Sequence, residues 1–274
     1  MQPAGAALEI EAARLVSKAP IRGAVDTHFH LDHSFGNLEY AAHRIPILAH
    51  EKVTSLMQEH YAAWQGVSHA PRLAPWEKRI AEAVDAADTK HKQADLEAYK
   101  WMFDMIDSAT LAYPTEALAP AKLPMRIDLG GVVAVIEFHA GHTMTDLIVR
   151  VPEHDLVYAG DLLFNRGFPV CLDADMLRWR KALDYLAGFP RRTRFIPGHR
   201  AVCGVEAVRE QAALFDDMHA HAEKMVRAGA GEEQASQRYV VPARFSDYGY
   251  RSWDFTVGAA MRSYYKSLRV RPLK

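Results

Sequence analysis

The feature that most constrains this chain is an H-x-H-x-D-H run at residues 28–33, directly after a short apolar segment. The apolar segment predicts a buried strand leading into the run. Alternate side chains of an extended segment share a face, so His28 and His30 can reach one ion together. If the chain then turns, Asp32 and His33 can reach a second ion beside the first. Imidazole nitrogen and carboxylate oxygen suit zinc, and also iron or manganese, so the run predicts a metal site.

Three further side chains with metal-binding chemistry each follow a predicted strand. They are His142 in a Gly-His-Thr tripeptide, Asp161 after a glycine, and His199 in a Pro-Gly-His tripeptide. The strands expected before them are residues 132–138, 156–159 and 194–196. Loops at strand ends are where a rigid sheet presents functional groups. We therefore expect these three residues to join the histidine run.

The order H-x-H-x-D-H, G-H-T, G-D-x-x-F and P-G-H resembles the metallo-β-lactamase superfamily, especially its glyoxalase II-like hydrolase branch. The resemblance covers residues from about 6 to 210. It implies an α/β fold, an αβ/βα sandwich of two facing sheets with metals at one edge. It also implies a ligand grouping, with His28, His30 and His142 on one ion, Asp32, His33 and His199 on the other, and Asp161 bridging both.

The implied activity is that of a dinuclear metal-dependent hydrolase holding two zinc ions, with iron or manganese as other candidates. A metal-bridging hydroxide would attack an ester, thioester, lactone or amide of a small molecule. Asp32 is expected to act catalytically by handling the proton. Asp161 stands where thiolate-using zinc β-lactamases carry cysteine, and His30 stands where flavo-diiron oxygen reductases carry glutamate.

Other functions remain open at this point. The same fold also serves mononuclear iron thiol or persulfide dioxygenases. A non-catalytic metal-binding protein is a further alternative. A nuclease is disfavoured because no basic tract accompanies the site.

The rest of the chain predicts one domain over residues 1–274 with two helical additions. A helix is expected near 6–18, and a helical insertion over about 50–112 follows the first strands. Proline residues divide this insertion into one helix near 51–65 and a longer one near 76–110. Strands resume at 125–129, and the region from about 204 to 274 is expected to be mainly helical.

Substrate-binding residues are less constrained by the sequence. Arg166 and Phe168 follow Asp161 closely, and Arg166 could hold an anionic substrate group. The insertion could cover the metals, and its aromatic residues either line a pocket or form the insertion's own core. These residues are Tyr61, Trp64, Trp76, Tyr99, Trp101 and Phe103.

The chain departs from the family pattern in two places. Only 27 residues precede His28, so the first sheet is expected to lack about three or four N-terminal strands, which would leave an unpaired edge. A truncated start or a partner chain in a homo-oligomer would account for this. Arg200 stands where glycine is usual after P-G-H, and we expect it to crowd the metal edge.

Composition excludes several other classes. The formal net charge is −1, which favours neither nucleic acid nor an anionic membrane. No apolar run is long enough to span a bilayer. Cys171 and Cys203 are expected to be free thiols, and the start of the chain does not resemble a signal peptide. These features predict a cytoplasmic protein.

Overall fold

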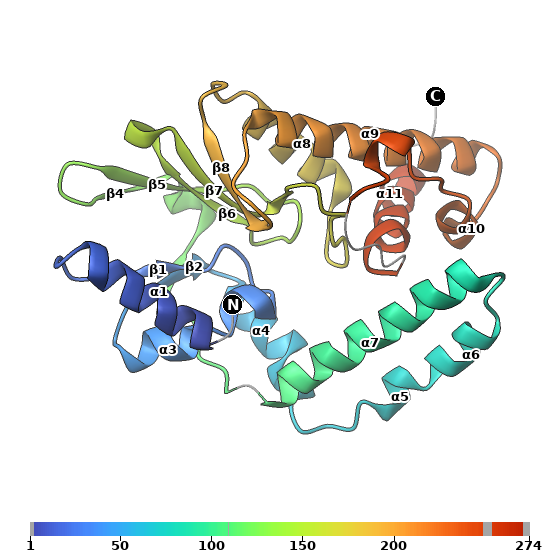
Figure 1. Cartoon of the computed structure of the whole chain (residues 1–274), viewed down its shortest axis with the longest axis horizontal. Helices are drawn as coiled ribbons and strands as arrows, with labels where there is room; N and C mark the ends of the chain where they lie inside the picture. Colours follow the sequence, from blue (N-terminus) through green and yellow to red (C-terminus); the bar gives the residue numbers. More distant parts are fainter. Residues whose placement is uncertain (1–2, 109, 249–253, 271–274) are drawn as a thin grey trace.

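Two β-sheets face each other in the computed structural model, which describes residues 3–108, 110–248 and 254–270 (Figure 1). The first sheet is parallel and has the order β1-β2-β3, with strands Ala24–Val25, Ile47–His50 and Glu116–Leu118. The second has the order β4-β5-β6-β7-β8, with strands Met125–Asp128, Val133–Phe138, Leu147–Val151, Leu156–Phe164 and Arg194–His199. Adjacent strands of this second sheet are antiparallel, except for β7 and β8, which are parallel.

Helices cover the outer face of each sheet (Figure 1). On the first sheet lie α1 (Pro3–Val16) and α3 (Asn37–Ala42). On the second lie α8 (Met176–Ala187) and α9 (Val205–Arg227), followed by α10 (Glu232–Gln237) and α11 (Ala259–Val270). This arrangement is the predicted αβ/βα sandwich.

The core between the sheets comes from strand positions that point inward. Leu48 and Leu118 of the first sheet pack against Ile136 and Leu147 of the second, and all four are buried. Burying one such side chain stabilises the folded state by about 1.5–3 kcal/mol. A larger core lies between the second sheet and its helices, where Trp179 of α8 is fully buried.

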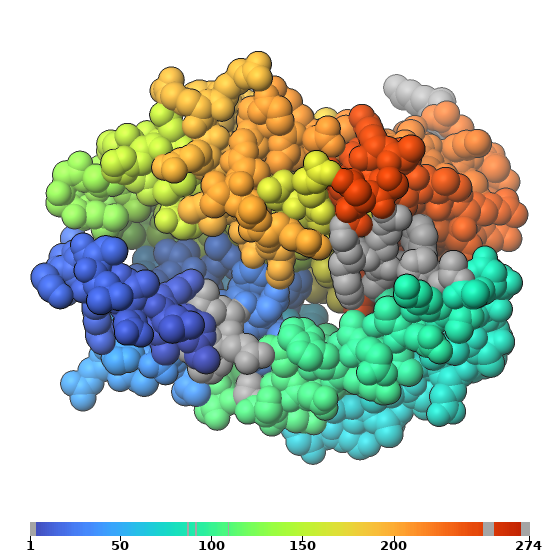
Figure 2. Space-filling model, viewed as in Figure 1, coloured from blue at the N-terminus to red at the C-terminus, as the bar shows by residue number. Residues whose placement is uncertain are grey.

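The helical insertion follows β2 and is helical as predicted. Its elements are α4 (Val53–His60), a 3-10 turn η1 (Ala62–Trp64), α5 (Ala70–Leu73), α6 (Pro75–Ala81) and α7 (Ala86–Ser108). Figure 2 shows it, in cyan to green, along the surface opposite the C-terminal helices. The prediction of a single helix near 76–110 is wrong, because α6 ends at Ala81 and α7 begins only at Ala86. The Asp85 carboxylate accepts a hydrogen bond from the Asp88 backbone N–H at 2.8 Å, as a residue does at a helix start.

The strands also differ from the sequence prediction in two respects. β3 was not predicted, because three residues show too little alternation. β7 and β8 continue beyond their predicted ends, so Asp161 and His199 lie on strands and not in loops. The β7–β8 register shifts on both sides of Gly160, whose φ of +54° suits glycine.

The first sheet is the smaller one. Among the described residues it contains three strands against five in the second sheet, and β1 forms its edge. Cys171 and Cys203 are free thiols, as predicted. None of the described helices combines the length and apolar character needed to cross a membrane.

A buried carboxylate ties the second sheet to α8. Glu137 of β5 accepts hydrogen bonds from the Arg150 Nε and the Tyr185 hydroxyl, both at 2.7 Å, and His139 Nε2 lies at 3.3 Å. Burial alone would raise the pKa of Glu137, but these three partners outweigh it and lower the pKa from 4.5 to about 2. The ionised form therefore stabilises the fold above about pH 4.5, and this stabilisation is lost as pH falls toward 2.

We predict that Glu137→Gln lowers the free energy of unfolding by about 1–3 kcal/mol at pH 7. The difference from wild type should shrink at pH 3, because the wild-type carboxylate is by then losing its contribution. Urea denaturation at both pH values measures this. Glu153→Gln, an exposed residue on the β6–β7 turn, is the matched control. Equal effects of the two substitutions would contradict a stabilising role for the ionised Glu137 carboxylate.

Candidate metal centre

The structure brings all seven predicted ligand side chains together at one end of the two sheets. They come from the segment after β1, a single-turn helix α2 (Leu31–Ser34), the β5–β6 loop, β7 and β8. Each of three groups places its nitrogen and oxygen atoms within 4.8 Å of one another. The groups are His28, His30 and His142; His28, His33 and Asp161; and Asp32, His33 and His199.

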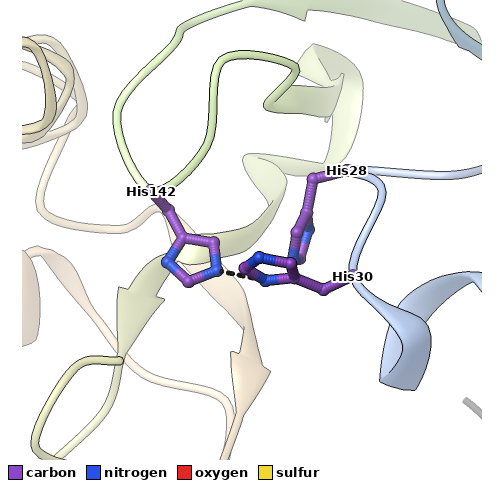
Figure 3. A group of neighbouring side chains, drawn as sticks. All are labelled: His28, His30 and His142. Carbon is purple, nitrogen blue, oxygen red and sulfur yellow. Dashed lines mark hydrogen bonds between the residues drawn. The ribbon is translucent and has the colours of Figure 1, made fainter. Parts of the chain in front are cut away.

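The first group consists of three histidine rings that turn toward a common point (Figure 3). His142 Nε2 lies 3.0 Å from His30 Nδ1. The other nitrogen of His142, Nδ1, lies 3.0 Å from the Val170 carbonyl oxygen and so donates to it. His30 Nε2 lies 2.8 Å from Asp173 Oδ2. His28 Nδ1 lies 3.1 Å from the Thr27 hydroxyl. Each ring is therefore anchored through one nitrogen and presents the other to the group, as metal-ligating histidines do.

The group of Asp32, His33 and His199 combines two histidines with a carboxylate. Asp32 Oδ2 lies 3.2 Å from His199 Nε2 and 3.3 Å from His33 Nε2. α2 places Asp32 and His33 side by side, which the extended strand before it could not do.

Asp161 lies between the group of His28, His30 and His142 and the group of Asp32, His33 and His199, and it contacts both. Its carboxylate oxygens are 3.1 Å from His33 Nε2, 3.4 Å from both His142 Nε2 and His199 Nε2, and 3.9 Å from His28 Nε2. Only 4% of its side chain is exposed. One buried carboxylate therefore faces four imidazoles that come from both groups.

Several buried atoms of this cluster lack a hydrogen-bond partner among the described residues. They are His28 Nε2, together with His33 Nε2 and Asp161 Oδ1, which lie 3.1 Å apart but without the geometry of a hydrogen bond. An unsatisfied buried polar atom costs about 1–3 kcal/mol. Cations coordinated by these atoms would remove that cost, so the donor set fits a metal site.

The electrostatics of the cluster suit cations as well. Burial lowers the pKa of His142 to about 3 and that of His28 well below its ordinary value, so both rings are neutral, as metal ligands must be. Burial would raise the pKa of Asp161, but the nearby His33 and His199 hold it far below its usual range. The cluster therefore keeps a carboxylate ionised in a buried place.

Asp146 holds the loop that carries His142. Its buried carboxylate accepts hydrogen bonds from the backbone N–H groups of Gly141 and Thr143, both at 2.9 Å, and from the Thr143 hydroxyl at 2.7 Å. The sequence could not distinguish this role from that of a simple strand-start residue.

Gly198 makes room for Asp161. A Cβ atom on Gly198 would lie 1.8 Å from Asp161 Oδ1, which no side chain can accommodate without moving the carboxylate. The glycine of the P-G-H motif thus serves the site through its neighbour on β7.

A cavity of about 720 Å³ opens onto this cluster. Residues of the metal centre form one wall, and the helical insertion forms the opposite wall. The insertion contributes His60, Tyr61, Trp64, Ala98, Tyr99, Trp101 and Met102. Of the insertion's six aromatic residues singled out in the sequence, four thus line the cavity, while Trp76 and Phe103 are buried.

The two candidate substrate residues differ in their surroundings. Phe168 lines the cavity. Arg166 is not among the lining residues, and its exposed side chain forms an ion pair with Asp247. Arg200 lines the cavity instead, at the metal edge as expected. Sequence reasoning missed Asp173, because no motif spacing links it to its partner His30.

Comparisons with known proteins agree with this architecture. A family model described as the metallo-beta-lactamase superfamily matches residues 2–199. No curated protein sequence matches significantly.

Two solved structures illustrate the likeness of fold. A metallo-β-lactamase from Pontibacter korlensis is 15% identical, with a TM-score of 0.51 and 76% of each chain covered. The stereoselective inverting sec-alkylsulfatase Pisa1 from Pseudomonas sp. is 17% identical, with a TM-score of 0.60. That comparison covers 94% of this chain and 43% of the sulfatase.

We predict that Gly198→Ala displaces the Asp161 carboxylate and lowers metal affinity by about 10–100-fold. The metal-free protein should melt within a few degrees of wild type, because the substitution lies beside the site. Metal content after dialysis and thermal melting with chelator measure the two effects. Gly231→Ala is the matched control, since its φ is −78° and nothing lies within 4 Å of the added Cβ. Full metal retention by Gly198→Ala would show that Asp161 is not a ligand.

Proposed function

This chain belongs to the metallo-β-lactamase superfamily, and from that membership and its site we propose that it is a dinuclear metal-dependent hydrolase of small molecules. The observation that carries the proposal is the position of Asp161, a buried carboxylate in contact with histidines of both groups. A single-ion site would need only one of these groups.

The proposed ligand assignment follows the two groups. His28, His30 and His142 would hold one ion, Asp32, His33 and His199 would hold the other, and Asp161 would be shared by both. Zinc suits this set of nitrogen and oxygen ligands, and iron or manganese would be accepted by the same atoms.

Two bound divalent ions would supply hydroxide at neutral pH and polarise a carbonyl oxygen. The residues of the chain then complete the reaction. Asp32 lines the cavity and is partly exposed, so its carboxylate can accept the proton that the attacking hydroxide loses and pass it to the departing alkoxide, thiolate or amine. Asp173 fixes the orientation of the His30 ring through Nε2. The insertion lines the cavity beside these residues.

The size of the cavity supports a small-molecule substrate. About 720 Å³ lies in the range typical of ligand pockets. Esters, thioesters, lactones and amides all present a carbonyl carbon to such a centre. A mononuclear iron dioxygenase would leave Asp32, His33 and His199 without a metal to bind, which favours the hydrolase.

Hydrolysis of a substrate panel tests the proposal. The panel contains an ester, a thioester, a lactone and an amide, together with a β-lactam and a secondary alkyl sulfate suggested by the names of the two similar proteins. We expect turnover of at least one substrate, loss of turnover with chelator, and two metal equivalents per chain by elemental analysis. One iron per chain, with thiol oxygenation and no hydrolysis, would instead indicate the dioxygenase.

We predict that Asp161→Ala reduces turnover by about 100-fold or more and lowers the content of both ions, because both sites lose a ligand. Asp184→Ala is the matched control, since Asp184 forms an exposed ion pair with Arg180 on α8 and such pairs contribute little. Two metal equivalents and full activity in Asp161→Ala would refute the assignment.

A further inference from the structure

One cationic side chain of the cavity has no role in the site described above. Arg200 directly follows His199, is exposed, and lines the cavity. Within the described part of the chain, no hydrogen bond or ion pair engages its guanidinium. Arg166, the other arginine near the site, is by contrast neutralised by Asp247.

The backbone of Arg200 gives a second, independent indication. Its φ is +80°, in the left-handed region that glycine adopts freely. A side chain there costs about 1–3 kcal/mol. Backbone strain of this kind is typical of functional sites, where the side chain itself is required. Glycine would adopt this backbone conformation at a lower free-energy cost, yet the chain carries arginine.

The chemistry of guanidinium defines what Arg200 could bind. Its planar array of N–H donors matches the two oxygens of a carboxylate or a sulfate in a bidentate pair. No carboxylate of the described residues occupies that position. An anionic group of a ligand in the cavity would therefore find an unpaired partner beside the metal edge.

The opposite wall of the cavity is apolar. Tyr61, Trp64, Tyr99 and Met102 of the insertion line it, and Phe168 adds a further ring from the segment after β7. Tyr61 and Phe168 are buried, and Trp64 is held by packing with Phe103. Such a wall favours an alkyl or aromatic group of a ligand.

We propose that the site selects amphiphilic anions, in which a carboxylate or sulfate binds Arg200 and an apolar group packs against the insertion. The scissile bond then lies between these two ends, at the metal ligands. This inference rests on the proposed hydrolase function and names its substrate class. Arg200 is the residue that determines the preference for an anion.

Ligand binding to the metal-loaded protein tests the proposal without requiring turnover. The probes are 4-phenylbutyrate, its neutral amide, and the matching alkyl sulfate, measured by calorimetry. Wild type should bind both anions about tenfold or more tightly than the amide. Arg200→Gln and Arg200→Gly should lose this preference while binding the amide as before, and Arg200→Lys should retain part of it. Arg200→Gly removes the backbone strain, so its folding is secure.

Direct binding of an anion to the metals would also favour carboxylate over amide. That preference, however, would remain after Arg200 is replaced. An unchanged preference in Arg200→Gln and Arg200→Gly therefore overturns the proposal. Arg191→Gln removes the same charge from an exposed ion pair with Glu206 and should not alter binding. Arg166→Gln tests the competing assignment, and a loss of preference there alone would also overturn the proposal.

The apolar half is tested by ligand length. Affinity should rise by about tenfold or more from acetate to 4-phenylbutyrate, and Trp64→Ala should reduce that gain. Equal affinity for the two acids would overturn the proposed apolar contact with the insertion.

If no panel substrate is hydrolysed but Arg200-dependent binding holds, the hydrolase proposal fails alone. If hydrolysis occurs without an Arg200-dependent preference, only the substrate class is wrong.

Discussion

The buried carboxylate of Asp161 is the interaction on which the rest of the site depends. It has almost no contact with water, and four imidazoles from three parts of the chain lie within 3.9 Å of it. A lone ionised carboxylate in such a place is costly, so it requires cationic partners. Protonated histidines can supply that charge in the metal-free protein, and divalent ions supply it more strongly. The cluster is therefore built for positive charge.

Much of the surrounding structure serves to hold this carboxylate and its partners. Gly198 leaves the space that Asp161 Oδ1 occupies, and the irregular register around Gly160 lets β7 present Asp161 at the sheet edge. Asp146 fixes the loop of His142 from behind. The αβ/βα sandwich thus provides a rigid edge, whereas the insertion provides a separate apolar wall. The candidate metal ligands come from the sandwich, and most of the apolar lining of the cavity comes from the insertion.

The sequence predicts the convergence at the metal centre well, because each ligand sits in a short motif next to a strand. Alternation along an extended segment places His28 and His30 together, and the three later motifs complete the set. The sequence does not predict where β7 and β8 end, because their length depends on pairing between distant segments. Nor does it predict that Trp64 faces the cavity while Trp76 is buried, since that depends on how the helices of the insertion pack. The contact between Asp173 and His30 arises only from the fold.

Anomalous X-ray diffraction from crystals of the metal-loaded protein tests the central claim most directly. We expect two peaks about 3.5–4 Å apart, with one oxygen of Asp161 on each. One peak should contact His28, His30 and His142, and the other Asp32, His33 and His199. A single peak, or ions bound without Asp161 between them, would contradict the account.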